Sequence, residues 1–261
     1  MIETDVYSPD RSLNGALRRR FVGLIERRPA KVRLERAMVT FAFDDAPVTA
    51  LDEGLSILEA RGLRGSLFVS AGLAGQDGAM GRYANREELM AAAAAGHELA
   101  CHTYSHLDCG QADEATVVAD LDRNRVAMAE WGAPTPTNFA YPYGDVSSAA
   151  KRAVSRRFNL SRGVHRGLIE TGTDLNQAPA IGVEGPAGCI YARRWLQYAV
   201  ARRAWVIFYT HDVSDEPSPF GCTPRGLREL VDRACSYHCD IVTVAEGVAR
   251  IGAERAALTA Q

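Results

Sequence analysis

Short apolar runs alternate with helix-like segments along most of the chain, and this alternation limits the folds that the sequence can adopt. The runs are rich in Val, Ile, Phe and Tyr and have the length of buried β-strands; they span residues 38–43, 66–70, 97–101, 138–141, 158–162, 180–183, 204–210 and 240–243. The helical segments between them span residues 48–61, 86–95, 113–131, 146–157, 191–202 and 224–236. Strand and helix repeated in this way predict a parallel sheet with helices outside it. The number of strand–helix units is close to the number that closes a barrel. We therefore expect a single α/β domain over residues 37–261, a distorted (β/α) barrel of about seven parallel strands.

The segment before the first strand, residues 1–36, is predicted to form a basic helical arm. Its positive charges are Arg11, Arg18, Arg19, Arg20, Arg27, Arg28, Lys31, Arg33 and Arg36. Such a run is either a solvated helix face or a docking surface, for a second copy of the chain in a homodimer or for peripheral contact with a partner or a membrane surface. The whole chain has a net charge of −2, so no global positive field favours nucleic acid.

The first residues and the apolar runs predict a cytoplasmic protein. The start, MIETDVYSPDRSLNG, lacks the basic and apolar regions of a secretory signal. No apolar run reaches the roughly 18 residues of a transmembrane segment. The six cysteines have no disulfide-framework spacing, as expected in a reducing compartment.

Ionisable and turn-forming residues follow four of the predicted strands. In barrels of this kind the chemistry gathers where the strands end at their carboxyl edge. The residues at these ends are Asp44-Asp45, the segment HTYSH from His102 to His106, the segment PYGD from Pro142 to Asp145, and His211-Asp212. Scattered surface charge would not place them all at one edge.

The segment HTYSH indicates a metal site. Two histidines four residues apart, on one side of a helical turn, could face one ion, and a carboxylate from the neighbouring strand end could join them. One of Asp44 and Asp45 would then be a ligand while the other accepts a proton from water, and His211 could protonate a leaving group. The alternative is that these are ordinary histidines, exposed, capped or hydrogen-bonded in the core.

These residues together resemble the NodB-homology polysaccharide deacetylases, carbohydrate esterase family four, over about residues 37–250. Phe43-Asp44-Asp45 is similar to the first family motif, His102-Thr103-x-x-His106 matches the second in full, and Tyr209-Thr210-His211 resembles the fifth. The resemblance implies that Asp44 is the catalytic base and His211 the general acid. It implies that Asp45, His102 and His106 hold one divalent metal ion, Zn²⁺ or a similar cation such as Co²⁺. Ala140-Tyr141-Pro142-Tyr143 resembles the third motif, in which the backbone N–H of Tyr143 would form the oxyanion hole.

The sequence departs from the family pattern at several positions. Ala140 stands where the motif has an Arg that orients the base, and Arg162 and Arg166 are the nearest candidates in sequence to replace it. Asp174, in GTDLN, is the best match to the fourth-motif Asp that tunes the acid. Ala46 replaces the usual Gly after the acid pair, and Tyr209 replaces a Leu that lines the acetyl pocket.

The family resemblance implies removal of N- or O-acetyl groups from glycans. We expect a polysaccharide N-deacetylase acting on N-acetylhexosamine residues of a bacterial exopolysaccharide, such as an adhesive polymer of the holdfast type in biofilms. One alternative is a hydrolase of another amide or ureide substrate on the same fold. The other is a catalytically inactive barrel that binds glycan without turnover.

Overall fold

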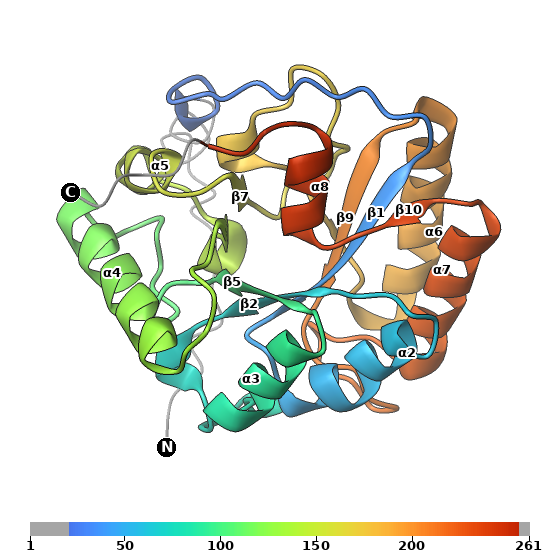
Figure 1. The fold of residues 1–261 in the computed structure, drawn as a ribbon, viewed down its shortest axis with the longest axis horizontal. Coiled ribbons are helices and arrows are strands. Elements are labelled where there is room, and N and C mark those ends of the chain that lie inside the picture. Colours follow the sequence, from blue (N-terminus) through green and yellow to red (C-terminus); the bar gives the residue numbers. More distant parts are fainter. Residues whose placement is uncertain (1–20, 256–261) are drawn as a thin grey trace.

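The computed structural model describes residues 21–255, and its centre is a sheet of parallel strands. The strands of this sheet are β1 (Met38–Asp44), β2 (Ser66–Val69), β5 (Glu98–Cys101), β6 (Asn138–Ala140), β7 (Leu160–Arg162), β8 (Ile181–Gly182), β9 (Trp205–Thr210) and β10 (Asp240–Ile241). They follow the order β7-β6-β5-β2-β1-β9-β8, with β10 also paired to β1, and every pair in this sheet is parallel. The sheet curls into a half-barrel (Figure 1), which confirms the predicted distorted (β/α) barrel.

One short segment connects the two edges of the curled sheet. Ala178 forms a parallel bridge with Arg162 at the end of β7, and Gly163 N donates to Ala178 O at 2.9 Å. Three residues later Ile181 pairs with Phe208 of β9. Residues 178–182 therefore pass from one edge to the other and complete the wall of the barrel.

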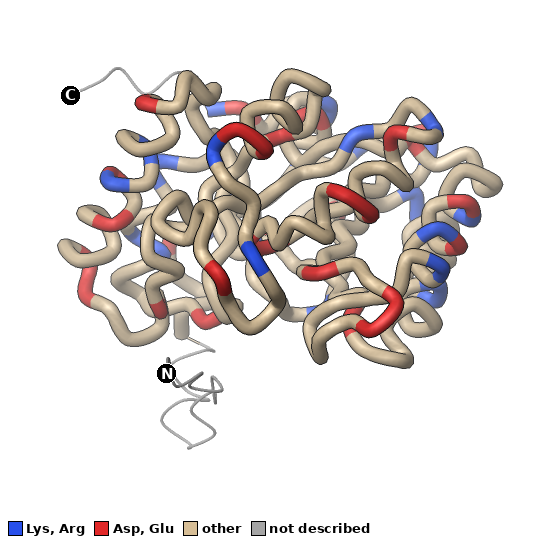
Figure 2. Tube along the Cα trace, turned by 90° about the horizontal axis from the view of Figure 1, so that it is seen from below, with Lys and Arg blue, Asp and Glu red and all other residues tan. Residues whose placement is uncertain are grey.

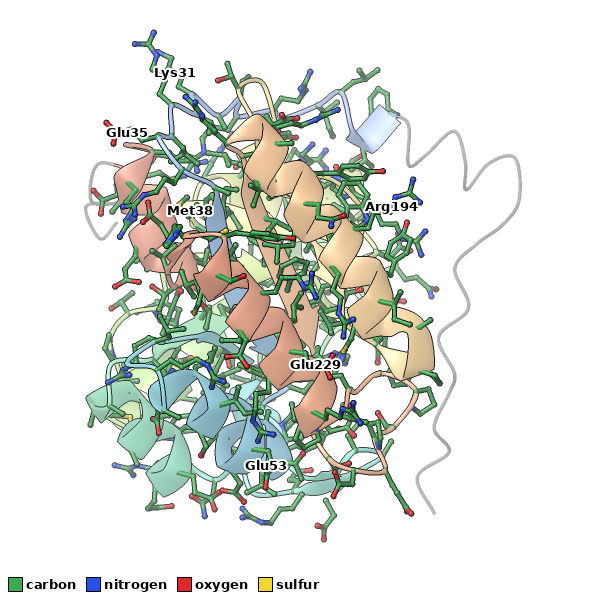
Figure 3. All side chains as sticks on the ribbon, turned by 90° about the vertical axis from the view of Figure 1, so that its right-hand side faces the viewer. Lys31, Glu35, Met38, Glu53, Arg194 and Glu229 are labelled. Atoms are coloured by element: carbon green, nitrogen blue, oxygen red, sulfur yellow. The ribbon has the colours of Figure 1, made fainter. Side chains whose placement is uncertain are left out.

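Except for α8 (Val244–Arg250), which lies over the middle of the curled sheet, the helices surround the sheet (Figure 1). They are η1 (Ala50–Leu55, a π-helix), α2 (Ser56–Glu59), α3 (Arg86–Ala94), α4 (Glu114–Glu130), α5 (Ser148–Ser155), α6 (Gly185–Arg202), α7 (Pro224–Ser236) and α8 (Val244–Arg250), with short 3-10 turns η2 (Ala71–Leu73), η3 (Pro142–Gly144) and η4 (Leu175–Gln177). Local signals explain several starts: Asn85 and Glu88 form a capping box for α3, and Asp113 caps α4. Figure 3 shows α6 and α7 side by side, where Arg193 of α6 forms an ion pair with Glu229 of α7.

Three elements differ from the sequence-based expectation. Helix α6 begins at Gly185, six residues earlier than predicted, because Pro186 is tolerated in the first turn of a helix. The connection between the end of β7 and this helix is consequently shorter than the predicted elements imply. An antiparallel hairpin, β3 (Asp77–Gly78) with β4 (Gly81–Arg82), and the final helix α8 were not expected.

Strand β1 lies in the middle of the sheet and is buried over its whole length. Val39, Phe41 and Phe43 pack in the cluster between sheet and helices, whereas Met38 and Ala42 belong to the cluster inside the barrel. Because successive strand residues alternate between faces, Asp44 continues the set that points inward. A strand buried on both faces reads as a continuous apolar run, and the sequence MVTFAF has this form.

The described part of the N-terminal arm, residues 21–36, packs on the barrel wall. Pro29 pairs with Asp174 in an antiparallel bridge, and Asn176 Nδ2 donates to Glu26 O at 2.6 Å. Val22 and Ala30 are buried. The rest of the arm, residues 1–20 with Arg11, Arg18, Arg19 and Arg20, lies outside the described residues. The boundary at residue 36 and a homodimer or peripheral contact through the arm stay predictions.

Charge is interspersed over the surface of the described chain, with acidic and basic residues following one another along the helices (Figure 2). Among residues 21–255, no helix combines the length and the hydropathy that crossing a membrane requires.

Candidate metal centre and active site

The chain turns sharply at the end of β1, directly after Asp44. Asp45 and Ala46 have φ angles of 60° and 51°, in the left-handed region that is unfavourable for residues other than glycine. Both carboxylates are buried, with 4% of Asp44 and 7% of Asp45 exposed. Because the turn breaks strand alternation, two adjacent acids can face one site.

Asp45 meets the two histidines of the segment HTYSH. Its Oδ1 lies 3.6 Å from His102 Nε2 and 3.4 Å from His106 Nε2. One ligand atom from each of these three residues can be chosen so that all lie within 4.8 Å of one another. The structure therefore brings together the predicted ligands Asp45, His102 and His106.

The chemistry of these three side chains fits a divalent cation. Asp45 Oδ1 is buried yet accepts no hydrogen bond within the described protein, which is costly for a carboxylate oxygen. Burial raises the pKa of Asp45 to about 7, and burial lowers the pKa of His102 to about 3 and that of His106 to about 4. The imidazoles are thus neutral, which is the form that binds metal. A cation would give the buried Asp45 oxygen the positively charged partner that it lacks.

Hydrogen bonds orient His102 and the backbone between the two histidines. His102 Nδ1 lies 2.8 Å from the carbonyl oxygen of Ala140, so this nitrogen donates and Nε2 is left for a cation. The carboxylate of Asp120, on α4, accepts from Tyr104 N at 2.6 Å and from Ser105 Oγ at 2.8 Å. The sequence indicated neither contact.

The expectation that the two histidines stand on one helical turn is wrong. Thr103 and His106 have φ angles of 61° and 54°, so the segment after β5 is a turn with two left-handed residues. The positive φ angles, rather than the helical period, bring both imidazoles to Asp45.

Asp44 forms a buried ion pair with Arg162. Arg162 is fully buried, and its guanidinium lies between the rings of Phe68 and Tyr209, at 4.7 and 4.8 Å from their centroids. Burial alone would raise the pKa of Asp44, but Arg162 and then His102 and His211 more than offset it, so this pKa lies below its usual value. Asp44 is therefore ionised at neutral pH and can accept a proton. The charge missing at Ala140 comes from Arg162, one of the two candidates considered from the sequence.

Tyr143 lies beside His106, in the turn η3. Its φ is 59°, and its ring packs against the ring of His106 with centroids 4.5 Å apart. Tyr143 is 42% exposed, so this turn lies at the protein surface next to His106.

His211 follows β9 and faces the same site. Its Nδ1 is 3.2 Å from the carbonyl oxygen of Phe220 and 3.6 Å from Glu184 Oε1. Burial and then the charge of Asp44 raise the pKa of Glu184 to about 7. The acidic residue that contacts His211 is thus Glu184, which stands two residues after the end of β8.

Asp174 lies elsewhere, and the structure does not bring it to His211. Its Oδ2 is 2.6 Å from Nζ of the buried Lys151, and its Oδ1 accepts from Arg28 N and Asn176 N. These contacts hold the arm and η4 on the wall of the barrel. The prediction that Asp174 tunes the acid is not supported by these contacts, because its charge is paired with Lys151.

Two residues at the site were missed from the sequence. Glu184 stands in a segment that read as loop, and only its position after the short strand 180–183 could have indicated it. Tyr83 forms an antiparallel bridge with Pro47, directly after the turn at Asp45 and Ala46. The next residue, Ala84, donates its backbone N–H to Ala46 O at 2.9 Å. Burial, with smaller effects of Asp45 and Tyr143, raises the pKa of Tyr83 to about 12, so its phenol is protonated at neutral pH.

Comparisons with known proteins agree with this architecture. Among solved structures, a Mycobacterium smegmatis protein described as a polysaccharide deacetylase has a TM-score of 0.67 at 19% identity, with 90% of this chain and 99% of that chain covered. The Xyl-CE4 domain of a multidomain xylanase from the hindgut metagenome of Trinervitermes trinervoides has a TM-score of 0.58 at 18% identity, with coverage of 84% and 92%. The chitin deacetylase of the fungal pathogen Colletotrichum lindemuthianum has a TM-score of 0.58 at 16% identity, with coverage of 82% and 89%. At these identities the likeness shows a shared fold.

The sequence itself identifies the family. Comparison with curated protein sequences gave no match. The sequence model named polysaccharide deacetylase matches residues 31–161, half of the chain, and this stretch includes Asp44, Asp45, His102 and His106. The chain therefore belongs to the polysaccharide deacetylase family.

Proposed function

We propose that this protein is a metal-dependent N-deacetylase that removes acetyl groups from N-acetylhexosamine residues of a bacterial exopolysaccharide. The observation that carries the proposal is that two adjacent acids, Asp44 and Asp45, have different surroundings. Asp44 is ionised through its ion pair with Arg162, while the buried Asp45 oxygen lies within 3.6 Å of two neutral imidazoles and has no hydrogen-bond donor. An ionised base beside three side chains that can bind a cation suits hydrolysis of an acyl group.

Asp45, His102 and His106 would hold the divalent cation. When bound, Zn²⁺, or Co²⁺ in its place, polarises an acyl carbonyl and makes water more acidic. The neutral imidazoles and the Asp45 carboxylate supply one negative charge, which leaves the cation a net positive charge to act on a substrate.

The remaining residues have separate tasks in the proposed reaction. Asp44 accepts the proton of the water that attacks the acetyl carbonyl carbon, and the Tyr143 backbone N–H donates to the oxygen that becomes negative. His211 donates a proton to the sugar nitrogen as the carbon–nitrogen bond breaks, which releases acetate and a free amine. The carbonyl oxygen of Phe220 at His211 Nδ1 leaves Nε2 to face the substrate.

The test is an acetate-release assay with protein freed of metal and then reloaded with Zn²⁺ or Co²⁺. Substrates are N-acetylated chito-oligosaccharides, O-acetylated xylan and N-acetylated exopolysaccharides, including adhesive polymers. We expect N-acetate release that depends on added metal and falls by about 10²–10⁴-fold in Asp44→Asn and in His211→Ala. Activity near wild type in either metal-loaded variant contradicts the assigned roles.

The same assay separates the alternatives. Chito-oligosaccharide binding without acetate release, at full metal occupancy, indicates an inactive glycan-binding barrel. Turnover of cyclic amides or ureides without added metal indicates the other hydrolase class. The presence of both His102 and His106 favours the deacetylase.

A further inference from the structure

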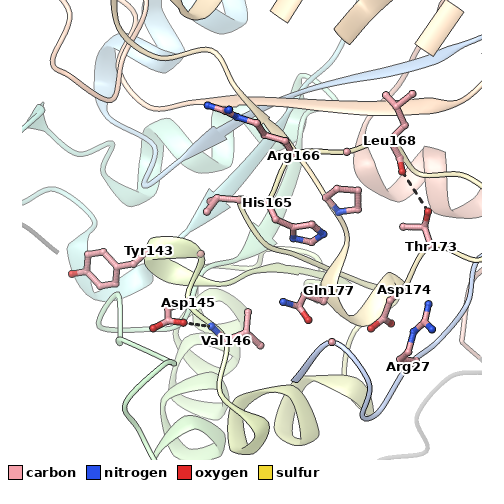
Figure 4. A pocket seen from close by; sticks show the side chains of 15 residues that line it. Arg27, Tyr143, Asp145, Val146, His165, Arg166, Leu168, Thr173, Asp174 and Gln177 are labelled. Carbon is pink, nitrogen blue, oxygen red and sulfur yellow. Dashed lines mark hydrogen bonds between the residues drawn. The ribbon is translucent and has the colours of Figure 1, made fainter. Parts of the chain in front are cut away.

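A cavity lies next to Tyr143, and its lining contains no other residue to which the proposed reaction gives a role. It has a volume of about 710 Å³, within the range of small-ligand sites (Figure 4). Tyr143 and Gly144 form one side of it, residues 164–168 and 173–179 form most of the remainder, and Gly23 and Arg27 of the arm complete it. Neither acid of the pair Asp44-Asp45, nor His211, lines this cavity.

Two guanidinium groups lie at the edge of this cavity, each held by a contact. Arg27 Nη2 donates to Gly172 O at 3.0 Å. The Arg166 guanidinium carbon is 4.6 Å from the centroid of the Tyr191 ring. Both residues belong to the lining of the cavity and are exposed to solvent. A guanidinium held in place loses less side-chain entropy when it binds an anion.

The carboxylates around the cavity do not cancel this charge. Asp174 is paired with Lys151, which is fully buried behind the lining. Asp145 is 8% exposed and accepts a hydrogen bond from Val146 N at 2.9 Å. The lining together with Lys151 carries three positive side chains and two carboxylates. Of the three positive side chains, only Arg27 and Arg166 are exposed.

Uncharged polar groups line the space between the charged residues. Figure 4 places His165 and Gln177 across from one another, and Thr173 also belongs to the lining. Imidazole, amide and hydroxyl groups recognise the hydroxyls of a sugar, whereas the guanidinium fork matches a carboxylate or a phosphate. The lining therefore suits a sugar that also carries a negative charge.

We propose that this cavity binds an anionic sugar residue, one that carries a carboxylate or phosphate group, in the glycan chain next to the residue that is deacetylated. The proposal rests on the proposed function, because the cavity meets the catalytic site only at Tyr143 and Gly144. The neighbouring unit of a polymer would enter the cavity while its acetylated unit lies at the metal centre. Arg27 and Arg166 would then select charged polymers over neutral ones.

Binding is measured with ligands that carry no acetyl group, so that it is independent of turnover. Tetragalacturonate carries carboxylates, glucose 6-phosphate carries a phosphate, and cellotetraose is the uncharged control. We expect at least one charged ligand to bind the wild type about tenfold more tightly than cellotetraose by titration calorimetry at about 50 mM salt. The charged ligand that binds identifies the group recognised.

Variants assign this binding to the two arginines. Arg27→Ala and Arg166→Ala should each weaken binding of the charged ligand by about fivefold or more, while Arg166→Lys retains part of it. Arg225→Ala is the matched control, because Arg225 is 88% exposed on α7 and pairs with Glu229. Equal binding of charged and neutral ligands, or unchanged binding in both alanine variants, overturns the proposal.

The outcomes separate this proposal from the proposed function. Acetate release together with equal binding of charged and neutral ligands removes only the anionic cavity. Arginine-dependent binding without acetate release from any glycan, in metal-loaded protein, removes the deacetylase function and leaves the cavity as a binding site.

Discussion

Arg162 is the cross-strand partner of Ala140 in the β6–β7 ladder. Paired residues of neighbouring parallel strands point to the same face of a sheet, so a side chain at either position enters the barrel near Asp44. The family motif has its arginine at the position of Ala140, and here the charge reaches Asp44 from the adjacent strand. Phe68 and Tyr209 hold the guanidinium between their rings.

Replacing Arg162 should impair both the base and the fold. In Arg162→Ala, burial would dominate the pKa of Asp44 and raise it, so the acid limb of the pH–rate profile should move to higher pH. We expect kcat to fall about 100-fold or more and the free energy of unfolding to fall by about 3–5 kcal/mol, as when one member of a buried ion pair is lost. Arg36→Ala, at an exposed ion pair, is the control.

The double variant Ala140→Arg, Arg162→Ala tests the cross-strand relationship directly. Because the two positions are paired, the new guanidinium should reach Asp44 and restore about tenfold or more of the lost activity. No recovery in a folded double variant would mean that position 140 cannot reach the base.

Glu184→Gln should change how stability depends on pH. Burial raises the folded-state pKa of Glu184 from 4.5 to about 7, so the stability linked to its protonated form is present below pH 4.5 and is lost as the pH rises through about 7. The free energy of unfolding of the variant should therefore equal that of the wild type near pH 4.5. Above about pH 7 it should exceed that of the wild type by about 1–3 kcal/mol. Urea unfolding at about pH 5 and about pH 8 measures the difference, and equal curves at both values would contradict it.

Glu184→Gln should also affect turnover, because its carboxylate lies 3.6 Å from His211 Nδ1. Glutamine keeps the size of the side chain but removes the negative charge beside the His211 ring, so the ring loses one of its two positioning partners. We expect kcat to fall by about tenfold with little change in KM. An unchanged kcat would show that Phe220 O alone positions His211.

Asp120→Ala should weaken metal binding without removing a ligand. Asp120 holds the backbone of Tyr104 and Ser105 between the two ligand histidines, and loss of such an outer contact typically costs about 10–100-fold in metal affinity. Competition with a chromogenic zinc chelator measures the affinity. Asp122→Ala, two residues along α4 and paired with Arg157 on the surface, should bind metal like the wild type.

Lys151→Met should destabilise the barrel wall and leave the chemistry intact. Lys151 is fully buried between Val22 O, at 2.7 Å, and Asp174, and its loss leaves a carboxylate without its cation. We expect the free energy of unfolding to fall by about 3–5 kcal/mol, with an unchanged pH–rate profile for the folded fraction. A shifted profile would restore Asp174 as a residue that tunes the acid.

The strands and most helices were predictable because their signals are local. MVTFAF and AWVIFYT are apolar over the whole length of β1 and β9, and Asn85 and Asp113 cap helices where the sequence indicates a start. The start of α6 was missed because Gly185, Pro186 and Gly188 read as turn residues, although Gly188 packs against the backbone of Val183, where a side chain would not fit.

The site was predictable where one short segment carries both chemistry and spacing. Asp44-Asp45 and His102 to His106 have this form, and the structure places Asp45, His102 and His106 together. The partners Arg162, Glu184 and Asp120 depend on strand register and helix packing between distant segments, which the sequence pattern does not encode. The left-handed angles of Asp45, Thr103 and His106 arise in the same way, since no glycine marks them.

The arm that packs on the barrel wall has a consequence for synthesis on the ribosome. Val22 and Glu26 bond to Lys151 and Asn176, which are separated from them by 129 and 150 positions in the chain. At ~5–20 residues per second, the arm emerges roughly 8–30 seconds before those partners exist. During that interval Val22 and Ala30, which are buried in the folded protein, are exposed to water or bound by a chaperone. The arm is therefore synthesised well before the segments that it packs against, and it is among the last parts of the described chain to reach its native place.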